Sequence, residues 1–139
     1  MKVQKIDTNA VLPTKAHTGD LGYDLYSSST ATIAPGDTIL VRTGIAVEFP
    51  KGYGALIRDR SSVATKKCLL VVAGVIDNGY TGEIQVAFHN SGPIEQHFFT
   101  GDKIAQMILI PTVDFAVEEV SSIKSADQRG DKGFGSTGQ

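Results

Sequence analysis

Gly74-Val75-Ile76-Asp77-Asn78-Gly79-Tyr80-Thr81-Gly82-Glu83-Ile84 is a glycine-rich stretch between two apolar runs. Its central dipeptide, Asn78-Gly79, is the strongest short hairpin signal that a sequence offers. The run from Leu69 to Ile76 is nearly all aliphatic, and from Ile84 to Phe88 apolar residues recur at every second position, which is the period of a strand. The stretch therefore predicts a β-hairpin whose two arms each bury at least one face.

Asp77 stands at the end of the first arm of this predicted hairpin. Burial beside apolar residues would set the basicity of its carboxylate. A turn without bulky side chains also leaves room for a ligand against the backbone. Asp77 is therefore a candidate general base.

Short apolar runs broken by turn residues continue from Val3 to about Ile110, and helical periodicity is almost absent. Closely spaced strands of this kind are typical of a β-sandwich or barrel, so we predict an all-β fold. One short helix is expected at Ser61–Lys67, with Ser61 or Ser62 as its N-cap. The other strands are expected, in chain order, at residues 3–6, 25–27, 31–33, 38–49, 53–58, 94–99, 103–110 and 115–120.

Length and composition indicate one soluble globular domain. The chain has 139 residues, of which 41% are hydrophobic and 20% charged, with a net charge of −2. This weakly acidic balance gives no electrostatic case for binding nucleic acid or an anionic membrane. Cys68 is the only cysteine, which excludes an intrachain disulfide and suits a reducing compartment. The first residues lack an apolar signal core, so we expect a cytoplasmic protein, or a nuclear one in a eukaryote.

The composition changes after Ser121, where Ser, Asp, Lys, Gln and Gly dominate. We therefore divide the chain into a single β domain, residues 1–120, and a flexible C-terminal arm, residues 121–139. The arm contains a cation, an aromatic ring and two hydroxyls spaced by glycines, which are the parts of a phosphate clamp with a stacking lid. The alternative is a disordered tail without a site. The residues concerned are Arg129, Phe134, Gly135, Ser136 and Thr137.

Three polar positions within residues 1–120 each allow a structural and a functional interpretation. Asp24 either accepts N–H groups in a turn or holds a divalent cation through water. Arg60 with Ser61 and Ser62 is either a surface charge cluster or an anion site at the start of a helix. Gln106 is either an edge-facing amide or one directed at a ligand.

These segments resemble, in order, the five motifs of the trimeric deoxyuridine triphosphatases, the dUTPases. Each motif is short, but five of them in sequence make the resemblance specific. The matching segments are Gly22–Leu25, Arg60–Ser62, Gly74–Ile84, Gly101–Gln106 and Arg129–Gly138.

The resemblance implies a jelly-roll-like homotrimer with active sites at subunit contacts. The implied reaction is hydrolysis of dUTP to dUMP and pyrophosphate with Mg²⁺ as cofactor, which keeps uracil out of DNA and supplies dUMP for thymidylate synthesis. Asp77 is implied to activate the water that attacks the α-phosphorus, and Asp24 to hold magnesium through its water shell. Little covalent work is required of the protein, because phosphoryl transfer depends mainly on electrostatic positioning.

The resemblance also assigns the substrate contacts. Tyr80 would pack under the deoxyribose and leave no room for a 2′-hydroxyl, while backbone groups near Gly74 and Gln85 would read the uracil edge. The phosphates would be bound by Arg60, Ser61, Ser62 and Gln106. In the arm, Arg129 would bind the γ-phosphate, Phe134 would cover the uracil, and Gly135, Ser136 and Thr137 would complete the phosphate contacts.

Asp59 departs from the family pattern, in which a proline often precedes the Arg-Ser pair. Its charge lies near the expected phosphate site, and it could pair with Arg58 or Arg60 and tune them.

Two other functions fit the same chain. A dCTP deaminase would share the fold and the hairpin, but its catalytic glutamate would fall on the returning arm at Ala87, where this chain has no acid. A non-enzymatic jelly-roll module for binding or signalling would keep the fold alone. The presence of Asp77, Tyr80, Arg129 and Phe134 favours an active enzyme.

Overall fold

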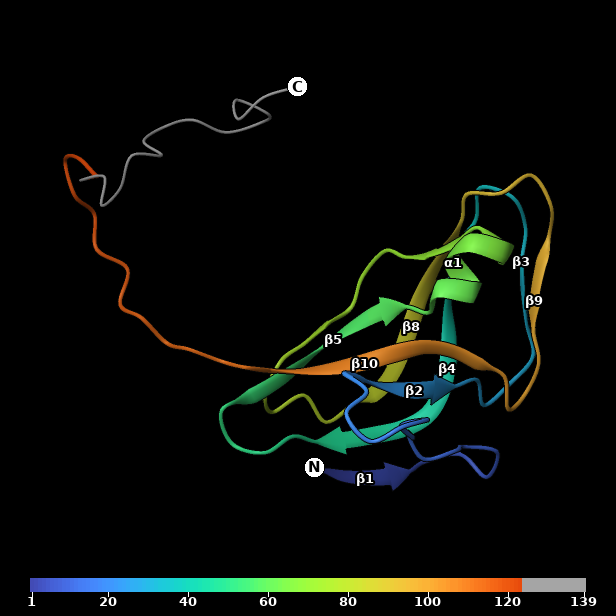
Figure 1. The fold of residues 1–139 in the computed structure, drawn as a ribbon, viewed down its shortest axis with the longest axis horizontal. Helices are drawn as coiled ribbons and strands as arrows, with labels where there is room; N and C mark the ends of the chain where they lie inside the picture. Colours follow the sequence, from blue (N-terminus) through green and yellow to red (C-terminus); the bar gives the residue numbers. More distant parts are fainter. Residues whose placement is uncertain (124–139) are drawn as a thin grey trace.

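The computed structural model describes residues 1–123 as an all-β body with one short helix (Figure 1). All strand pairs are antiparallel. The first sheet has the order β1-β4-β8-β6, formed by Lys2–Lys5, Thr38–Glu48, Glu83–Asn90 and Leu69–Val71. The second has the order β2-β10-β5-β7, formed by Gly22–Tyr26, Lys103–Pro111, Tyr53–Asp59 and Val75–Ile76. A third, two-stranded sheet pairs β3, Ala31–Ile33, with β9, Gln96–Phe98.

A single apolar core takes in residues from all three sheets and from the helix. The period-two pattern of β8 is confirmed, since Ile84, Val86 and Phe88 are all fully buried. Phe88 meets Phe98 of β9 with ring centroids 5.1 Å apart, which joins the small sheet to the core. The predicted strands at 3–6, 31–33, 38–49, 53–58, 94–99 and 103–110 are confirmed to within one or two residues at most ends.

The predicted hairpin is only partly formed. Its first arm divides: β6 pairs with β8, with Val71 opposite Phe88, whereas β7 crosses to the other sheet and pairs with β5. The Asn78-Gly79 turn therefore connects strands of different sheets. The turn is held by Asn78, whose Nδ2 donates to the carbonyl oxygens of Pro50 (3.0 Å) and Tyr53 (2.6 Å). The stretch from Gly74 to Ile84 thus bridges two sheets instead of closing one.

Helix α1, Ser61–Lys67, has the predicted bounds but not the predicted cap. Its N-cap is Arg60, in an extended conformation and without a side-chain capping bond, so the prediction of Ser61 or Ser62 was wrong. The reason is that Arg60 continues the extended backbone of β5 while Asp24 holds its guanidinium. Both serines therefore fall in the first helical turn. No helix within residues 1–123 is long and apolar enough to cross a membrane.

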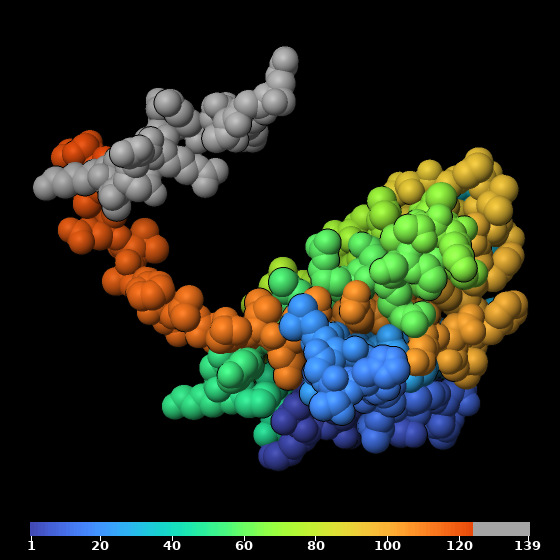
Figure 2. All heavy atoms as spheres, viewed as in Figure 1, coloured from blue at the N-terminus to red at the C-terminus, as the bar shows by residue number. Residues whose placement is uncertain are grey.

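The strand predicted at residues 115–120 is wrong. Residues 112–123 form no regular structure and leave the body beyond β10 (Figures 1 and 2). Val113, Phe115 and Val117 alternate as in a strand, yet they are 72%, 84% and 101% exposed. An apolar alternation forms a strand only where a neighbouring strand pairs with it, and within residues 1–123 this segment has none.

Gly44 allows a bulge in β4, and its substitution tests that packing. Its φ is +67°, and a Cβ there would lie 2.7 Å from the Cβ of Asp7. Gly36 has a similar φ of +81° but open space around it. We expect Gly36→Ala to lower the free energy of unfolding by about 1 kcal/mol through backbone strain alone. Gly44→Ala should cost about 2 kcal/mol or more, since overpacking adds to the strain. Equal losses in urea unfolding would contradict the packing of this bulge.

Candidate active site

A pocket of ≈ 360 Å³ brings together residues from three of the sequence motifs. It is lined by Asp24, Arg60, Ser61, Ser62 and Gln106. β10 is the organising strand, because its central position places Gln106 opposite Asp24 of β2 on one side and opposite Arg58 of β5 on the other. The five residues lie together as the sequence predicted for a phosphate site.

The charges of this pocket favour an anion. Asp24 binds two cations: its Oδ1 lies 3.0 Å from Nε of Arg60, and its Oδ2 lies 2.7 Å from Nζ of Lys103. Arg60 is held further by the carbonyl oxygen of Lys103, which accepts from Nη1 at 3.2 Å. The hydrogen bond to Asp24 raises the pKa of Lys103, so this amine is charged at neutral pH. One carboxylate between two cations leaves a net positive charge, which attracts phosphate.

Lys103 was not assigned a role from the sequence. The signal was present, because Lys103 lies inside the quoted segment Gly101–Gln106. A lysine beside a turn is common, however, and only the pairing of β10 with β2 shows that this one reaches Asp24.

Gln106 is oriented by its two neighbouring strands. Its Nε2 donates to the carbonyl oxygen of Asp59 at 2.8 Å, and a Cβ at Gly22 would lie 2.5 Å from its Oε1. Gly22 therefore makes room for this amide. Asp59 does not tune the arginines as proposed from the sequence: its carboxylate accepts the N–H of Val71 at 2.5 Å, so it ties β5 to β6.

The second group of candidate residues lies on the reversal between β7 and β8. The carbonyl oxygen of Gly74 accepts the N–H of Ile57 at 2.7 Å, and a Cβ on Gly74 would lie 2.6 Å from the carbonyl oxygen of Ile57. Glycine is thus required here for close approach to β5. Tyr80 is 45% exposed, and its hydroxyl donates to the carbonyl oxygen of Glu83 at 3.1 Å.

Asp77 is exposed, so the expected burial beside apolar residues is wrong for the single chain. β7 is a two-residue strand at the edge of its sheet, and the turn residues that follow project beyond it. The backbone at Asp77 is nevertheless fixed, because its carbonyl oxygen accepts the N–H of Tyr80 at 3.2 Å. The carboxylate is held in place by a rigid turn and is open to water.

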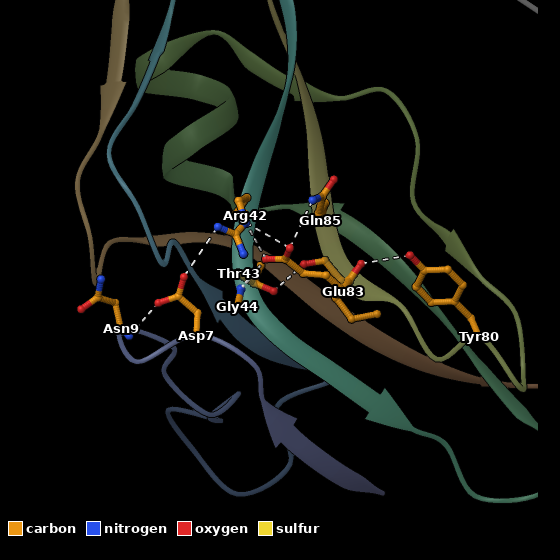
Figure 3. A network of polar contacts seen from close by, with 9 residues as sticks. Asp7, Asn9, Arg42, Thr43, Gly44, Tyr80, Glu83 and Gln85 are labelled. Carbon is orange, nitrogen blue, oxygen red and sulfur yellow. Dashed lines mark hydrogen bonds and ion pairs between the residues drawn. The ribbon is translucent and has the colours of Figure 1, made fainter.

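A polar network lies beside this reversal (Figure 3). The carboxylate of Glu83 accepts the N–H of Gly44 at 2.8 Å, Nε of Arg42 at 3.1 Å and Nε2 of Gln85 at 3.2 Å. Burial acts to raise the pKa of Glu83, but these hydrogen bonds outweigh it and hold the pKa below its ordinary value. Sequence reasoning assigned no role to Glu83 or Arg42. The side chain of Gln85 faces this network, which leaves its backbone for the predicted contact with a base.

The two groups of residues are separate in the described part of the chain. No hydrogen bond or ion pair within residues 1–123 joins the pocket at Asp24 to the reversal at Asp77. Both depend on β5, since Ile57 contacts Gly74 and Asp59 precedes Arg60. The predicted arm residues Arg129, Phe134, Gly135, Ser136 and Thr137 lie outside the described residues.

Metal ligands are sparse. Residues 1–123 contain no group of three or more His, Cys, Asp or Glu side chains placed to hold an ion. Asp24 is the one carboxylate that lines the phosphate pocket, and it already contacts two cations. Because Mg²⁺ prefers several oxygen ligands and keeps part of its water shell, these residues fit a metal held mainly by phosphate oxygens.

An all-β body with a positively charged, hydroxyl-lined pocket and a separately mounted carboxylate has the parts of an enzyme that acts on nucleotide phosphates. Comparison with known proteins makes this class specific. The protein-family model described as dUTPase matches residues 8–138. The chain therefore belongs to the dUTPase family, and the resemblance seen in the sequence is confirmed.

Relatives and solved structures agree with this assignment. The deoxyuridine 5′-triphosphate nucleotidohydrolase of Clostridioides difficile is 43% identical over 99% of this chain and 97% of its own length. That of Clostridium acetobutylicum is 42% identical over 99% and 96%. The dUTPase of Staphylococcus bacteriophage 80alpha with dUpNHpp superposes with a TM-score of 0.92 at 27% identity, covering 99% of this chain and 98% of that one. The predicted jelly-roll-like fold is thus confirmed.

The lowered pKa of Glu83 predicts a pH dependence of stability. A carboxylate whose pKa is lower in the folded state contributes stability above its unfolded value, near 4.5, and loses it as the pH falls through the folded value. We expect Glu83→Gln to be less stable than the parent at neutral pH, with the difference shrinking below about pH 4.5. Urea unfolding between pH 3 and pH 7 measures this. Glu118→Gln, at an exposed position, is the control and should follow the parent throughout. A constant difference for Glu83→Gln would contradict the role of its charge.

The pairing of Lys103 with Asp24 predicts a contribution of this lysine to anion binding. We expect Lys103→Met to weaken binding of inorganic pyrophosphate by about tenfold or more, the size of a lost charged hydrogen bond. Isothermal titration calorimetry at two salt concentrations measures the affinity and its ionic part. Lys5→Met removes an exposed lysine at the end of β1 and should leave the affinity unchanged. Equal affinities of Lys103→Met and the parent would remove Lys103 from the site.

Proposed function

We propose that the protein hydrolyses dUTP to dUMP and pyrophosphate, with water attacking the α-phosphorus. The observation that carries the proposal is the convergence of Asp24, Arg60, Ser61, Ser62 and Gln106 in one pocket of a dUTPase-family chain. The reaction lowers dUTP, which limits uracil incorporation into DNA, and supplies dUMP for thymidylate synthesis. We further propose that the enzyme acts in the cytoplasm, or in the nucleus of a eukaryote.

The phosphate pocket stabilises charge. Arg60 and Lys103 supply fixed cations, and the hydroxyls of Ser61 and Ser62 supply neutral donors at the start of α1. As the bond to the leaving pyrophosphate breaks, negative charge accumulates on its oxygens, and donors already in position stabilise it without reorganisation. Asp24 keeps both cations oriented before substrate arrives. The orientation of Gln106 by Asp59 and Gly22 aims its remaining amide hydrogen.

Asp77 serves as the general base. Its carboxylate is open to water while its backbone is fixed by the turn to Tyr80 and by the anchoring of Asn78 on the segment before β5. The base takes a proton from water as the water attacks phosphorus, which requires a defined direction more than a shifted pKa.

The same turn carries the discriminator for the sugar. Tyr80 packs under the deoxyribose, where its ring leaves no space for a 2′-hydroxyl. Backbone groups near Gly74 and Gln85 read the uracil edge, and the close approach of Gly74 to β5 fixes one side of that slot. In the arm, Arg129, Phe134, Gly135, Ser136 and Thr137 complete the phosphate and base contacts.

Magnesium enters with the nucleotide. Asp24 would hold the ion through its water shell, while the triphosphate supplies direct ligands. When bound, the ion neutralises charge on the phosphates. This agrees with the net positive charge of the empty arrangement of Asp24, Arg60 and Lys103, which disfavours a free cation. A structure of the dUTPase of phage phi11 of S. aureus, 26% identical with a TM-score of 0.83, is described as revealing the coordination of a structural Mg(II) ion.

We propose that the enzyme is a homotrimer with active sites at subunit contacts. Support comes from the segment 112–123, which extends away from the body with exposed Val113, Phe115 and Val117 (Figure 2). Alternating apolar side chains on an extended segment need a covering surface, and a second copy supplies one. Asp77, exposed in one chain, would then be enclosed by a neighbour.

Two alternatives are disfavoured. A dCTP deaminase needs an acid on the returning arm, where this chain has Ala87, 8% exposed, with its carbonyl oxygen accepting the N–H of Val72. A binding or signalling module without activity needs no such arrangement of cations, hydroxyls and a carboxylate as the one around Asp24 and Asp77.

A nucleotide panel and one variant test the proposal. We expect pyrophosphate release from dUTP, little from UTP, dTTP or dCTP, and a loss of activity when magnesium is chelated. Asp77→Asn should lower kcat by about 10²–10⁴-fold while dUTP affinity is kept, because it removes charge and keeps shape. Asp37→Asn, at an exposed position in a turn, is the control. Ammonia release from dCTP would overturn the reaction, and an unchanged kcat would overturn the role of Asp77.

A further inference from the structure

We propose that the ion pair between Glu83 and Arg42 positions Tyr80 and thereby sets the discrimination between deoxyribose and ribose. The inference rests on the proposed function, in which Tyr80 contacts the sugar. It adds Glu83 and Arg42 as positioning residues that touch no substrate.

The device begins at the bulge of β4. Arg42 stands opposite Gln85 on β8, whereas Ala46 stands opposite Glu83, so the three residues Thr43–Ile45 face a single residue of β8. The bulge turns the N–H of Gly44 toward the carboxylate of Glu83. The Thr43 hydroxyl donates to the carbonyl oxygen of Ile84, which fastens the start of β8 a second time. The returning arm is therefore bound to β4 at the point where the reversal ends.

Glu83 is enclosed and fully engaged. Its side chain is only 13% exposed, and both carboxylate oxygens accept hydrogen bonds: Oε1 from Gly44, Oε2 from Gln85, and both from Arg42. Arg42 is held from its other side by Asp7, with Nη1 and Oδ2 3.7 Å apart. Removing one member leaves partly buried polar groups without partners, so this pair matters more than an exposed ion pair.

The other end of the same residue holds Tyr80. The carbonyl oxygen of Glu83 accepts the Tyr80 hydroxyl at 3.1 Å, and Figure 3 shows the ring reaching across to it from the turn. A Cβ on Gly82 would collide with this ring, so glycine is needed between the two. Tyr80 is otherwise 45% exposed. Its ring is thus fixed by the backbone turn at one end and by Glu83 at the other.

The consequence is a linkage from the bulge to the sugar site. When the carboxylate is bound, the backbone at Glu83 is fixed and so is the tip of the Tyr80 ring. When it is released, the ring keeps its apolar surface but loses its exact height under the sugar. Steric exclusion of a 2′-hydroxyl depends on that height, whereas binding of the common parts of dUTP and UTP does not.

The test compares kcat/KM for dUTP and for UTP, with magnesium, in Glu83→Gln, Tyr80→Phe and the double variant. Tyr80→Phe keeps the ring and removes its bond to Glu83. We expect each single variant to lower the dUTP-to-UTP ratio by about five- to thirtyfold. The double variant should fall no further than the single ones, since both changes cut the same linkage.

Controls separate positioning from a general loss of stability. Arg42→Gln removes the same ion pair from its more exposed member, at 48% exposure, and should reproduce the change in ratio. Arg42→Lys keeps the charge and should restore most of it. Glu95→Gln breaks an ion pair with His97 on the opposite edge and should leave the ratio unchanged. Thermal unfolding of each variant shows whether it is folded under the assay conditions.

The outcomes are distinct. An unchanged ratio in Glu83→Gln and Arg42→Gln, or additive effects in the double variant, would overturn the inference. Tyr80→Ala identifies the level of a failure. If Tyr80→Ala lowers the ratio but Tyr80→Phe does not, the ring excludes ribose without Glu83, and the proposed function stands while the inference falls. If Tyr80→Ala also leaves the ratio unchanged, the role proposed for Tyr80 itself is wrong.

Discussion

One carboxylate shared between two cations organises the phosphate end of this molecule. Asp24 on β2 binds Arg60 at the start of α1 and Lys103 at the start of β10. Three segments far apart in the sequence thereby meet at one point, with Ser61 and Ser62 carried along in the first turn of the helix. The arrangement costs little in the absence of substrate, because each cation has a partner. It still leaves a net positive charge to attract phosphate.

Much of the fold could be predicted from local patterns, and the errors share a cause. The alternation of Ile84, Val86 and Phe88 needs only one buried face, and it was correct. The single hairpin was wrong because Asn78-Gly79 specifies a turn but not which strands its arms pair with, and β7 finds a better partner in β5. The strand at 115–120 has the right alternation but no neighbour in the described chain. Pairing is a non-local property that residue patterns do not contain.

The site divides in the same way. Resemblance to the family located Asp24, Arg60, Ser61, Ser62 and Gln106, which the structure places in one pocket. It did not find Lys103, Arg42 or Glu83, because their roles come from partners 79 and 41 residues away. A sequence shows which residues are capable of a hydrogen bond. Only the register of β10 with β2, and the bulge of β4 against β8, show which bonds are made.

The two halves of the site are rigid for different reasons, and this suits the chemistry proposed for them. The phosphate pocket is fixed by charges between strands of one sheet, so it can hold oxygen atoms of like charge close together. The reversal is fixed by backbone contacts of Gly74 and Asn78 and by the carbonyl oxygen of Glu83, which leaves Asp77 open to water. A general base needs a defined water, and an exposed carboxylate gains one only when a surface closes over it. The exposure of Asp77 and of the segment 112–123 therefore has one explanation, assembly with further copies of the chain, in which apolar burial supplies the energy and the covered base gains its function.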